Sequence, residues 1–85
     1  MKSIWIGHFD NKEIKVENTW LHGERLFVNG VLQDETFGFA STKLLGHVTD
    51  QSGNKLGLKA NIGGFLKITC SVFVDDKKVL LVQQK

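Results

Sequence analysis

The sequence contains no proline, a single cysteine and a single arginine among its 85 residues. Without proline, the chain lacks the simplest residue for protecting exposed sheet edges, so charges and turns must protect them. The lone thiol, Cys70, excludes an intramolecular disulfide, whereas small secreted domains usually depend on several. The N-terminal segment also lacks the apolar core of a signal peptide. We therefore expect a cytoplasmic protein.

The chain also lacks a large excess of charge of one sign. Eleven basic and nine acidic residues give a formal net charge of +2, and the two signs are interspersed along the chain. Ten of the eleven cations are lysine, whereas recognition of phosphates and base edges usually recruits arginine. No apolar run approaches the roughly 18 residues of a membrane span. We therefore expect no membrane partner, and we do not expect nucleic acid as the main partner.

The length allows one domain, residues 1–85. A chain of this size buries only about 60% of the surface of its unfolded form, so a large enclosed cleft would compete with the core for side chains. The composition therefore favours a binding protein over an enzyme.

Short runs of valine, isoleucine and threonine alternate with glycine, asparagine and aspartate clusters, a pattern typical of strands. Residues 13–20 place Ile14, Val16 and Trp20 on one face and charged side chains on the other. The pattern predicts an all-β, antiparallel sandwich or flattened barrel of seven or eight short strands with little or no helix. The expected strands are residues 3–8, 13–20, 25–28, 31–33, 36–42, 44–50 and 54–62, followed by a C-terminal hairpin.

Two turns predict strand registers. Asn29-Gly30 is the strongest hairpin signal in the chain, since a type I′ turn needs positive φ at both central positions, and it pairs Val28 with Val31. A turn ending at a left-handed Gly53 would pair Val48 with Leu56.

Two further registers rest on apolar matching alone. A loop of residues 63–65 would place Ile62 opposite Leu66 and Ala60 opposite Ile68, and a turn at residues 75–78 would place Val74 opposite Val79.

No catalytic or metal-binding constellation is evident. Cys70 has the phase of a core residue, where a thiol behaves as a small hydrophobe. His8, His22 and His47 lack the local spacing of zinc ligands. The acidic pairs 34–35 and 75–76 lie at predicted loops, where such residues serve turn geometry and solubility. We expect no cofactor and no metal.

One predicted sheet face carries lysines beside an aromatic ring. Lys55, Lys59, Lys67 and Phe73 share this face in the predicted register, as on a small platform for single-stranded nucleic acid. Lysines on a solvated sheet are also ordinary devices for solubility and edge protection.

The C-terminal hairpin is apolar on both predicted faces. Val72, Val74, Val79 and Leu81 form one face, and Phe73, Leu80 and Val82 form the other. Such a strand pair is either covered within the fold or covered by a partner, and both alternatives remain open at this stage. Near the N-terminus, Trp5 lies on the opposite strand face from Ile4 and Ile6, so this segment is also apolar on both faces. Here too, the second face is covered either within the fold or by a partner. The candidate partner-binding residues are therefore Phe73, Leu80, Val82 and Trp5.

The order of hairpin segments at residues 24–30, 44–46, 59–62, 64–65 and 73–77 resembles that of the Fas apoptotic inhibitory molecule family. The resemblance spans residues 24–80 and implies a small β-sandwich that works through protein contacts rather than catalysis. The chain departs from the family in its last strands, where Ile68, Cys70 and Val72 replace aromatic residues. No functional residue is carried over.

The sequence thus predicts a small non-enzymatic binding or assembly module that acts through protein contacts, with a homodimer through the C-terminal hairpin as one form. The alternative is a single-stranded nucleic-acid-binding domain that uses Lys55, Lys59, Lys67 and Phe73.

Overall fold

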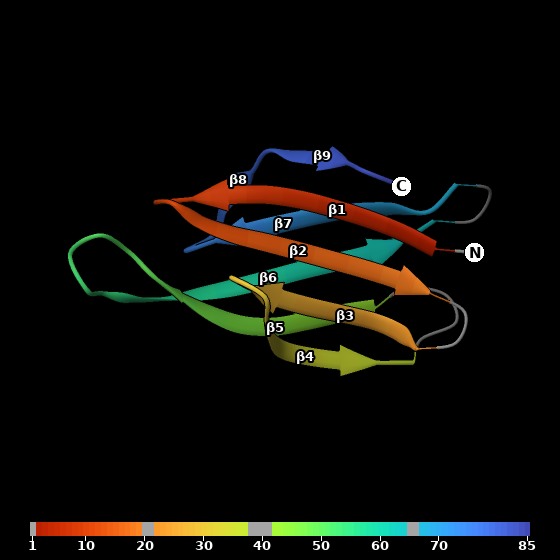
Figure 1. The fold of residues 1–85 in the computed structure, drawn as a ribbon, viewed down its shortest axis with the longest axis horizontal. Coiled ribbons are helices and arrows are strands. Elements are labelled where there is room, and N and C mark those ends of the chain that lie inside the picture. Colours follow the sequence, from red (N-terminus) through yellow and green to blue (C-terminus); the bar gives the residue numbers. More distant parts are fainter. Residues whose placement is uncertain (1, 20–21, 38–41, 65–66) are drawn as a thin grey trace.

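Two antiparallel sheets form a sandwich (Figure 1). The computed structural model describes residues 2–19, 22–37, 42–64 and 67–85, and these contain no helix. One sheet has the strand order β4-β3-β2-β1-β9 and the other β5-β6-β7-β8. The strands are β1 (Lys2–Phe9), β2 (Lys12–Thr19), β3 (Gly23–Val28), β4 (Val31–Thr36), β5 (Thr42–Thr49), β6 (Lys55–Gly63), β7 (Thr69–Val74), β8 (Lys77–Val79) and β9 (Leu81–Gln83). The expected all-β antiparallel sandwich is confirmed, and the described residues form nine strands in place of the expected seven or eight.

The core lies between the two sheets and follows the period-2 alternation of the strands. Ile14 and Val16 of β2 are fully buried, as their pattern predicts. The other buried apolar residues are Trp5, Leu26, Leu44, Val48, Leu58, Ala60, Ile62, Val72, Val74 and Val79. Both sheets therefore contribute to one continuous core.

Trp5 belongs to this core, which corrects its assignment to a partner-binding surface. The turn between β1 and β2 has two central residues, Asp10 and Asn11, both with positive φ. This turn pairs Trp5 with Val16, and cross-strand partners share a face. Trp5 is consequently only 4% exposed, whereas Ile4 and Ile6 lie half-buried on the outer face.

Both turn-based registers are confirmed. Asn29 and Gly30 have positive φ, and Val28 pairs with Val31. Gly53 is left-handed, and Val48 pairs with Leu56. The predicted strand 36–42 can be compared with the structure only at its ends, because residues 38–41 lie outside the described part of the chain. Trp20, Phe65 and Leu66 also lie outside it.

The predicted register between β6 and β7 is wrong by four residues. Ile62 pairs with Cys70 rather than Leu66, and Ala60 pairs with Val72 rather than Ile68. Strand β6 ends at Gly63 and β7 begins only at Thr69, and at Gly64 positive φ and the nearby Lys67 carbonyl leave no room for a side chain. A shift by an even number keeps Cys70 and Val72 on their predicted face, whereas Ile68 precedes β7 and is 41% exposed.

The predicted C-terminal hairpin forms between β7 and β8, but its predicted register is wrong. Asp75 and Asp76 both adopt positive φ and form a two-residue turn, so Val79 pairs with Val72 rather than Val74. The chain then leaves the four-stranded sheet after Val79 and crosses at Leu80 to the other sheet, where β9 pairs with β1. The segment is apolar in both phases because it serves two sheets, with Val79 buried in one and Leu81 packed against the core in the other.

Gly7 lets this crossover approach β1. A Cβ atom at Gly7 would lie 2.8 Å from the carbonyl oxygen of Leu80 and 2.8 Å from Cδ2 of Leu81. Beyond β9, the Gln84 N–H donates to the Ile4 carbonyl at 2.7 Å. These contacts fix the position of Leu80 at one long border of the sandwich.

Candidate functional site

The structure separates the four predicted partner-binding residues. Trp5 lies in the core, and Phe73 lies half-buried on the outer face of the four-stranded sheet. Leu80, at the crossover, is 87% exposed, and Val82, on β9, is 58% exposed. Leu80 and Val82 are therefore the two of the four that are exposed, and they lie two residues apart in the chain.

The border formed by β4 and β5, termed the closed border, is joined by side chains. The register of β3 and β4 shifts between Leu26 and Phe27, which leaves Gln33 as an extra residue. The Gln33 Oε1 atom accepts the His47 N–H at 3.3 Å, and the Asp34 Oδ2 atom accepts the Leu45 N–H at 2.9 Å. These acceptors occupy main-chain donors that another strand would otherwise pair with.

The opposite border, termed the open border, consists of β8, Leu80 and β9. Strand β8 pairs with β7 only over residues 72–74, so residues 69–71 have no strand neighbour on that side within the described chain. Strand β9 ends its sheet and lies along the margin of the molecule in Figure 1. Exposed leucine and valine side chains thus lie beside unpaired strand edges, the combination that favours association with another chain.

A hollow of about 460 Å³ lies at the open border. We term it the crossover hollow, and its lining residues are Cys70, Lys78, Val79, Leu80 and Leu81. Four of the five are apolar or weakly polar. Leu80, which is 87% exposed, therefore lines a mainly apolar hollow.

The thiol of Cys70 is suited to packing rather than nucleophilic chemistry. Burial raises its pKa from 9.0 to about 12. The thiolate is the reactive form, so at pH 8 its population is roughly a thousandfold below that of an exposed thiol. We expect alkylation by iodoacetamide to be slower in the folded protein than in urea by a similar factor. A folded-state rate like that of an exposed thiol would contradict this.

The predicted lysine face is assembled only in part. Lys55 and Lys59 lie on the outer face of β6, whereas Lys67 lies in the loop before β7. Lys59 pairs with Phe73, and Phe73 pairs with Lys78, which sequence reasoning did not place here. The Lys59 ammonium lies 3.3 Å from an Asp76 carboxylate oxygen, an exposed ion pair of small energetic value.

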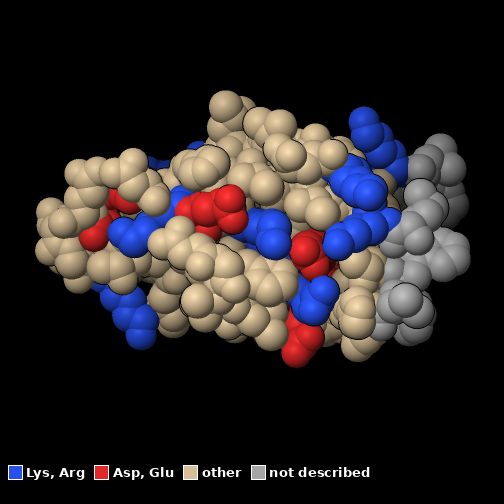
Figure 2. Space-filling model, viewed as in Figure 1, with Lys and Arg blue, Asp and Glu red and all other residues tan. Residues whose placement is uncertain are grey.

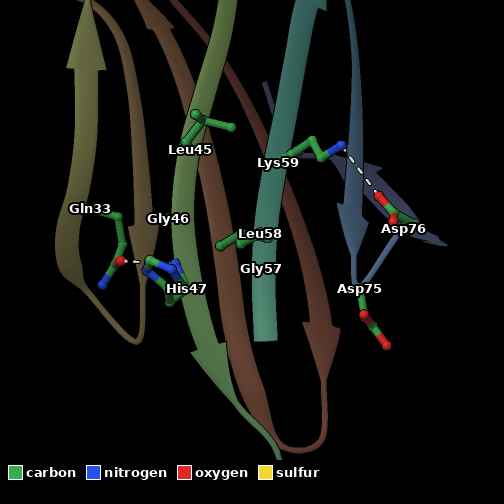
Figure 3. A pocket seen from close by; sticks show the side chains of 9 residues that line it. All are labelled: Gln33, Leu45, Gly46, His47, Gly57, Leu58, Lys59, Asp75 and Asp76. Carbon is green, nitrogen blue, oxygen red and sulfur yellow. Dashed lines mark hydrogen bonds and ion pairs between the residues drawn. The ribbon is translucent and has the colours of Figure 1, made fainter. Parts of the chain in front are cut away.

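A second hollow, of about 600 Å³, lies on this face over Gly57 (Figure 3). We term it the Gly57 hollow. Figure 3 shows Lys59 reaching toward Asp76 and Gln33 lying against His47. Its lining residues are Gln33, Leu45, Gly46, His47, Gly57, Leu58, Lys59, Asp75 and Asp76.

The fold does not require glycine at position 57. Its φ is not positive, and a Cβ atom there would meet nothing within 4 Å. Because glycine weakens a strand interior, we expect Gly57→Thr to raise the free energy of unfolding by about 0.5–1 kcal/mol in urea denaturation. Gly7→Ala is the matched control and is expected to lose about 1–3 kcal/mol through steric conflict with the crossover. Destabilisation by Gly57→Thr would contradict the open geometry.

Sequence reasoning missed an ionic cluster on the outer face of the five-stranded sheet. Glu17 belongs to the charged face of residues 13–20, yet its side chain is only 7% exposed. Arg25 Nη2 lies 3.0 Å from one of its carboxylate oxygens and Lys15 Nζ lies 3.5 Å from the other. Both cations also lie over the Phe27 ring. The sequence signal for this cluster is the opposite charge of Glu17 and Arg25, which lie directly opposite each other on β2 and β3.

The charged side chains form no field of one sign on the face turned to the viewer in Figure 2, where basic and acidic groups are interspersed. His8, His22 and His47 are exposed at separate positions. Among the described residues, no group of three or more histidine, cysteine, aspartate or glutamate side chains could hold a metal ion. The described part of the chain also contains no helix long and apolar enough to cross a membrane.

Comparison with family models, curated proteins and solved structures found no match to this chain. The resemblance to the Fas apoptotic inhibitory molecule family therefore stays a prediction.

Proposed function

We propose that this protein is a small non-enzymatic binding or assembly module that contacts other protein chains, copies of itself included, through its open border. The observation that carries the proposal is the 87% exposure of Leu80 beside Val82 and the unpaired edges of β7 and β9. Large apolar side chains at a sheet edge favour pairing with another chain.

The contrast between the two borders supports this proposal. At the closed border, Gln33 and Asp34 use their side chains to occupy the N–H groups of β5. At the open border, the described residues provide no comparable side-chain acceptors, and Leu80 and Val82 are exposed there together with Lys77 and Lys78. The two borders therefore differ in the side chains that occupy strand-edge N–H groups at the closed border, although Val31, Leu32 and Leu45 are exposed there as well.

Size-exclusion chromatography with light scattering, over a protein concentration series, tests the self-association part. We expect a concentration-dependent rise in molar mass for the wild type and its loss in Leu80→Asp and Val82→Lys. Leu45→Asp, which changes an equally apolar exposed residue away from this border, should behave like the wild type. A strict monomer at millimolar concentration would remove self-association from the proposal.

A second candidate function, binding of single-stranded nucleic acid, is favoured by one observation. Phe73 lies between Lys59 and Lys78 in a cross-strand row, so a stacking ring has a cation on either side. Asp76 opposes this use of Lys59. Titration of labelled oligonucleotides at roughly 50 and roughly 200 mM salt should show a steep loss of affinity at the higher salt concentration, and Asp76→Asn should strengthen binding. Absence of a salt slope would exclude phosphate contacts.

A further inference from the structure

The turn between β3 and β4 is tied to β2 by a side chain. Strands β2 and β3 pair as far as Ile14 and Val28. Beyond this pair, the Asn29 N–H donates to the Glu13 carbonyl at 2.8 Å, and the Glu13 N–H donates to the Asn29 Oδ1 atom at 2.8 Å. The side-chain amide of Asn29 therefore supplies the acceptor that a main-chain carbonyl supplies within an antiparallel ladder.

The same side chain precedes an unobstructed main-chain nitrogen. Gly30 is exposed, and a Cβ atom there would meet nothing within 4 Å. The nitrogen of a residue that follows asparagine can attack the asparagine amide carbon, because a five-membered ring closes, and a glycine offers no side chain to obstruct the approach. The other asparagines precede Lys12, Thr19, Lys55 and Ile62. Asn29 is therefore the asparagine of this chain with the least obstructed neighbour.

We propose that Asn29 is a modification site at which the chain deamidates itself, with water as the co-reactant. The Gly30 nitrogen loses its proton and bonds to Asn29 Cγ, the Cγ–Nδ2 bond breaks, and ammonia leaves with that proton. Water then adds to one carbonyl carbon of the succinimide ring, and the bond from that carbon to the Gly30 nitrogen breaks. Opening at Cγ gives aspartate, and opening at the main-chain carbonyl carbon gives isoaspartate. The reaction needs no partner at the open border.

The hydrogen bonds to Glu13 set the rate of this reaction in the folded protein. Ring closure brings Asn29 Cγ onto the Gly30 nitrogen, so the side chain must first release the Glu13 N–H. The turn therefore has to open locally, and local opening costs less free energy than global unfolding. The folded chain is expected to convert, but more slowly than the unfolded chain.

The two products differ in their effect on the closed border. Aspartate at this position keeps an oxygen acceptor for the Glu13 N–H. Isoaspartate lengthens the main chain by one atom, which is incompatible with the two-residue turn in which Asn29 and Gly30 both have positive φ. Strand β4 follows this turn, and its Gln33 and Asp34 side chains occupy N–H groups of β5. Isoaspartate is therefore expected to expose these N–H groups.

Ion-exchange chromatography and peptide mass mapping test the proposal on protein incubated at mildly alkaline pH, folded and in urea. We expect a species with one added negative charge that maps to Asn29 and forms several-fold faster in urea than in the folded protein. Asn11 is the matched internal control, since it is exposed and has positive φ in a two-residue turn but precedes Lys12. Asn11 should stay unmodified, and the variant Asn29→Asp should gain no charge.

Equal rates in the folded protein and in urea would overturn the control by Glu13. Conversion of Asn11 as fast as that of Asn29, or no conversion of Asn29 in the folded protein, would overturn the site itself. Amide hydrogen exchange of the isolated isoaspartate form tests the structural consequence. The N–H groups of Leu45 and His47 should exchange several-fold faster than in Asn29→Asp, and unchanged exchange would overturn the effect on the closed border.

Discussion

Substitution Trp5→Ala is expected to lower the free energy of unfolding by about 3–5 kcal/mol, the range for removing a large buried aromatic side chain. Trp5 is 4% exposed and shares the inner face of its sheet with Val16. Domains of this size are marginally stable, so such a loss removes much of their stability. Urea denaturation followed by circular dichroism measures the effect.

Val82→Ala is the matched control, since Val82 is 58% exposed on β9 beside β1. It should change the free energy of unfolding by less than about 0.5 kcal/mol, as is usual for exposed positions. If Trp5→Ala were as stable as the wild type and instead lost association, Trp5 would be a contact residue after all and the described core would be wrong.

Substitution Arg25→Met is expected to destabilise the protein by about 2 kcal/mol. Removing one partner of a fully buried ion pair costs about 3–5 kcal/mol, because the remaining charge stays buried without compensation. Here the cost is smaller because Arg25 is partly exposed and Lys15 still contacts Glu17. The Nε atom of Arg25 is buried without a hydrogen-bond partner, which further limits what its loss removes.

A double variant distinguishes the ionic effect from lost packing over Phe27. Adding Glu17→Gln to Arg25→Met removes the uncompensated charge, so the double variant should recover about 1 kcal/mol relative to Arg25→Met alone. Lys43→Met, at an exposed position of β5, should stay within about 0.5 kcal/mol of the wild type. An Arg25→Met variant as stable as the wild type would contradict the buried position of Glu17.

The sequence was sufficient to predict the fold class and the registers that depend on local turn chemistry. Asn29-Gly30 and Gly53 specify positive φ at defined positions, and the strands around them pair as expected. Asp75-Asp76 adopts the same kind of two-residue turn, but without glycine it gives a weaker signal, and its register was missed.

The remaining errors arise from contacts distant in sequence. Leu80 marks the change of sheet, yet the local pattern 79–83 fits a continued hairpin equally well, and only pairing with β1 decides between them. Both phases of residues 4–7 are apolar or small, so the burial of Trp5 follows from the turn at Asp10-Asn11 rather than from alternation. The candidate site emerged only when the two borders could be compared.

The central claim is that the open border is the surface through which the protein associates. Backbone amide NMR shifts recorded over a protein concentration series test it most directly, because they locate the contact without any substitution. The expected result is a set of concentration-dependent shifts confined to residues 69–71 and 78–83. Shifts confined to Leu45, His47 and the closed border, or no shifts at millimolar concentration, would contradict the claim.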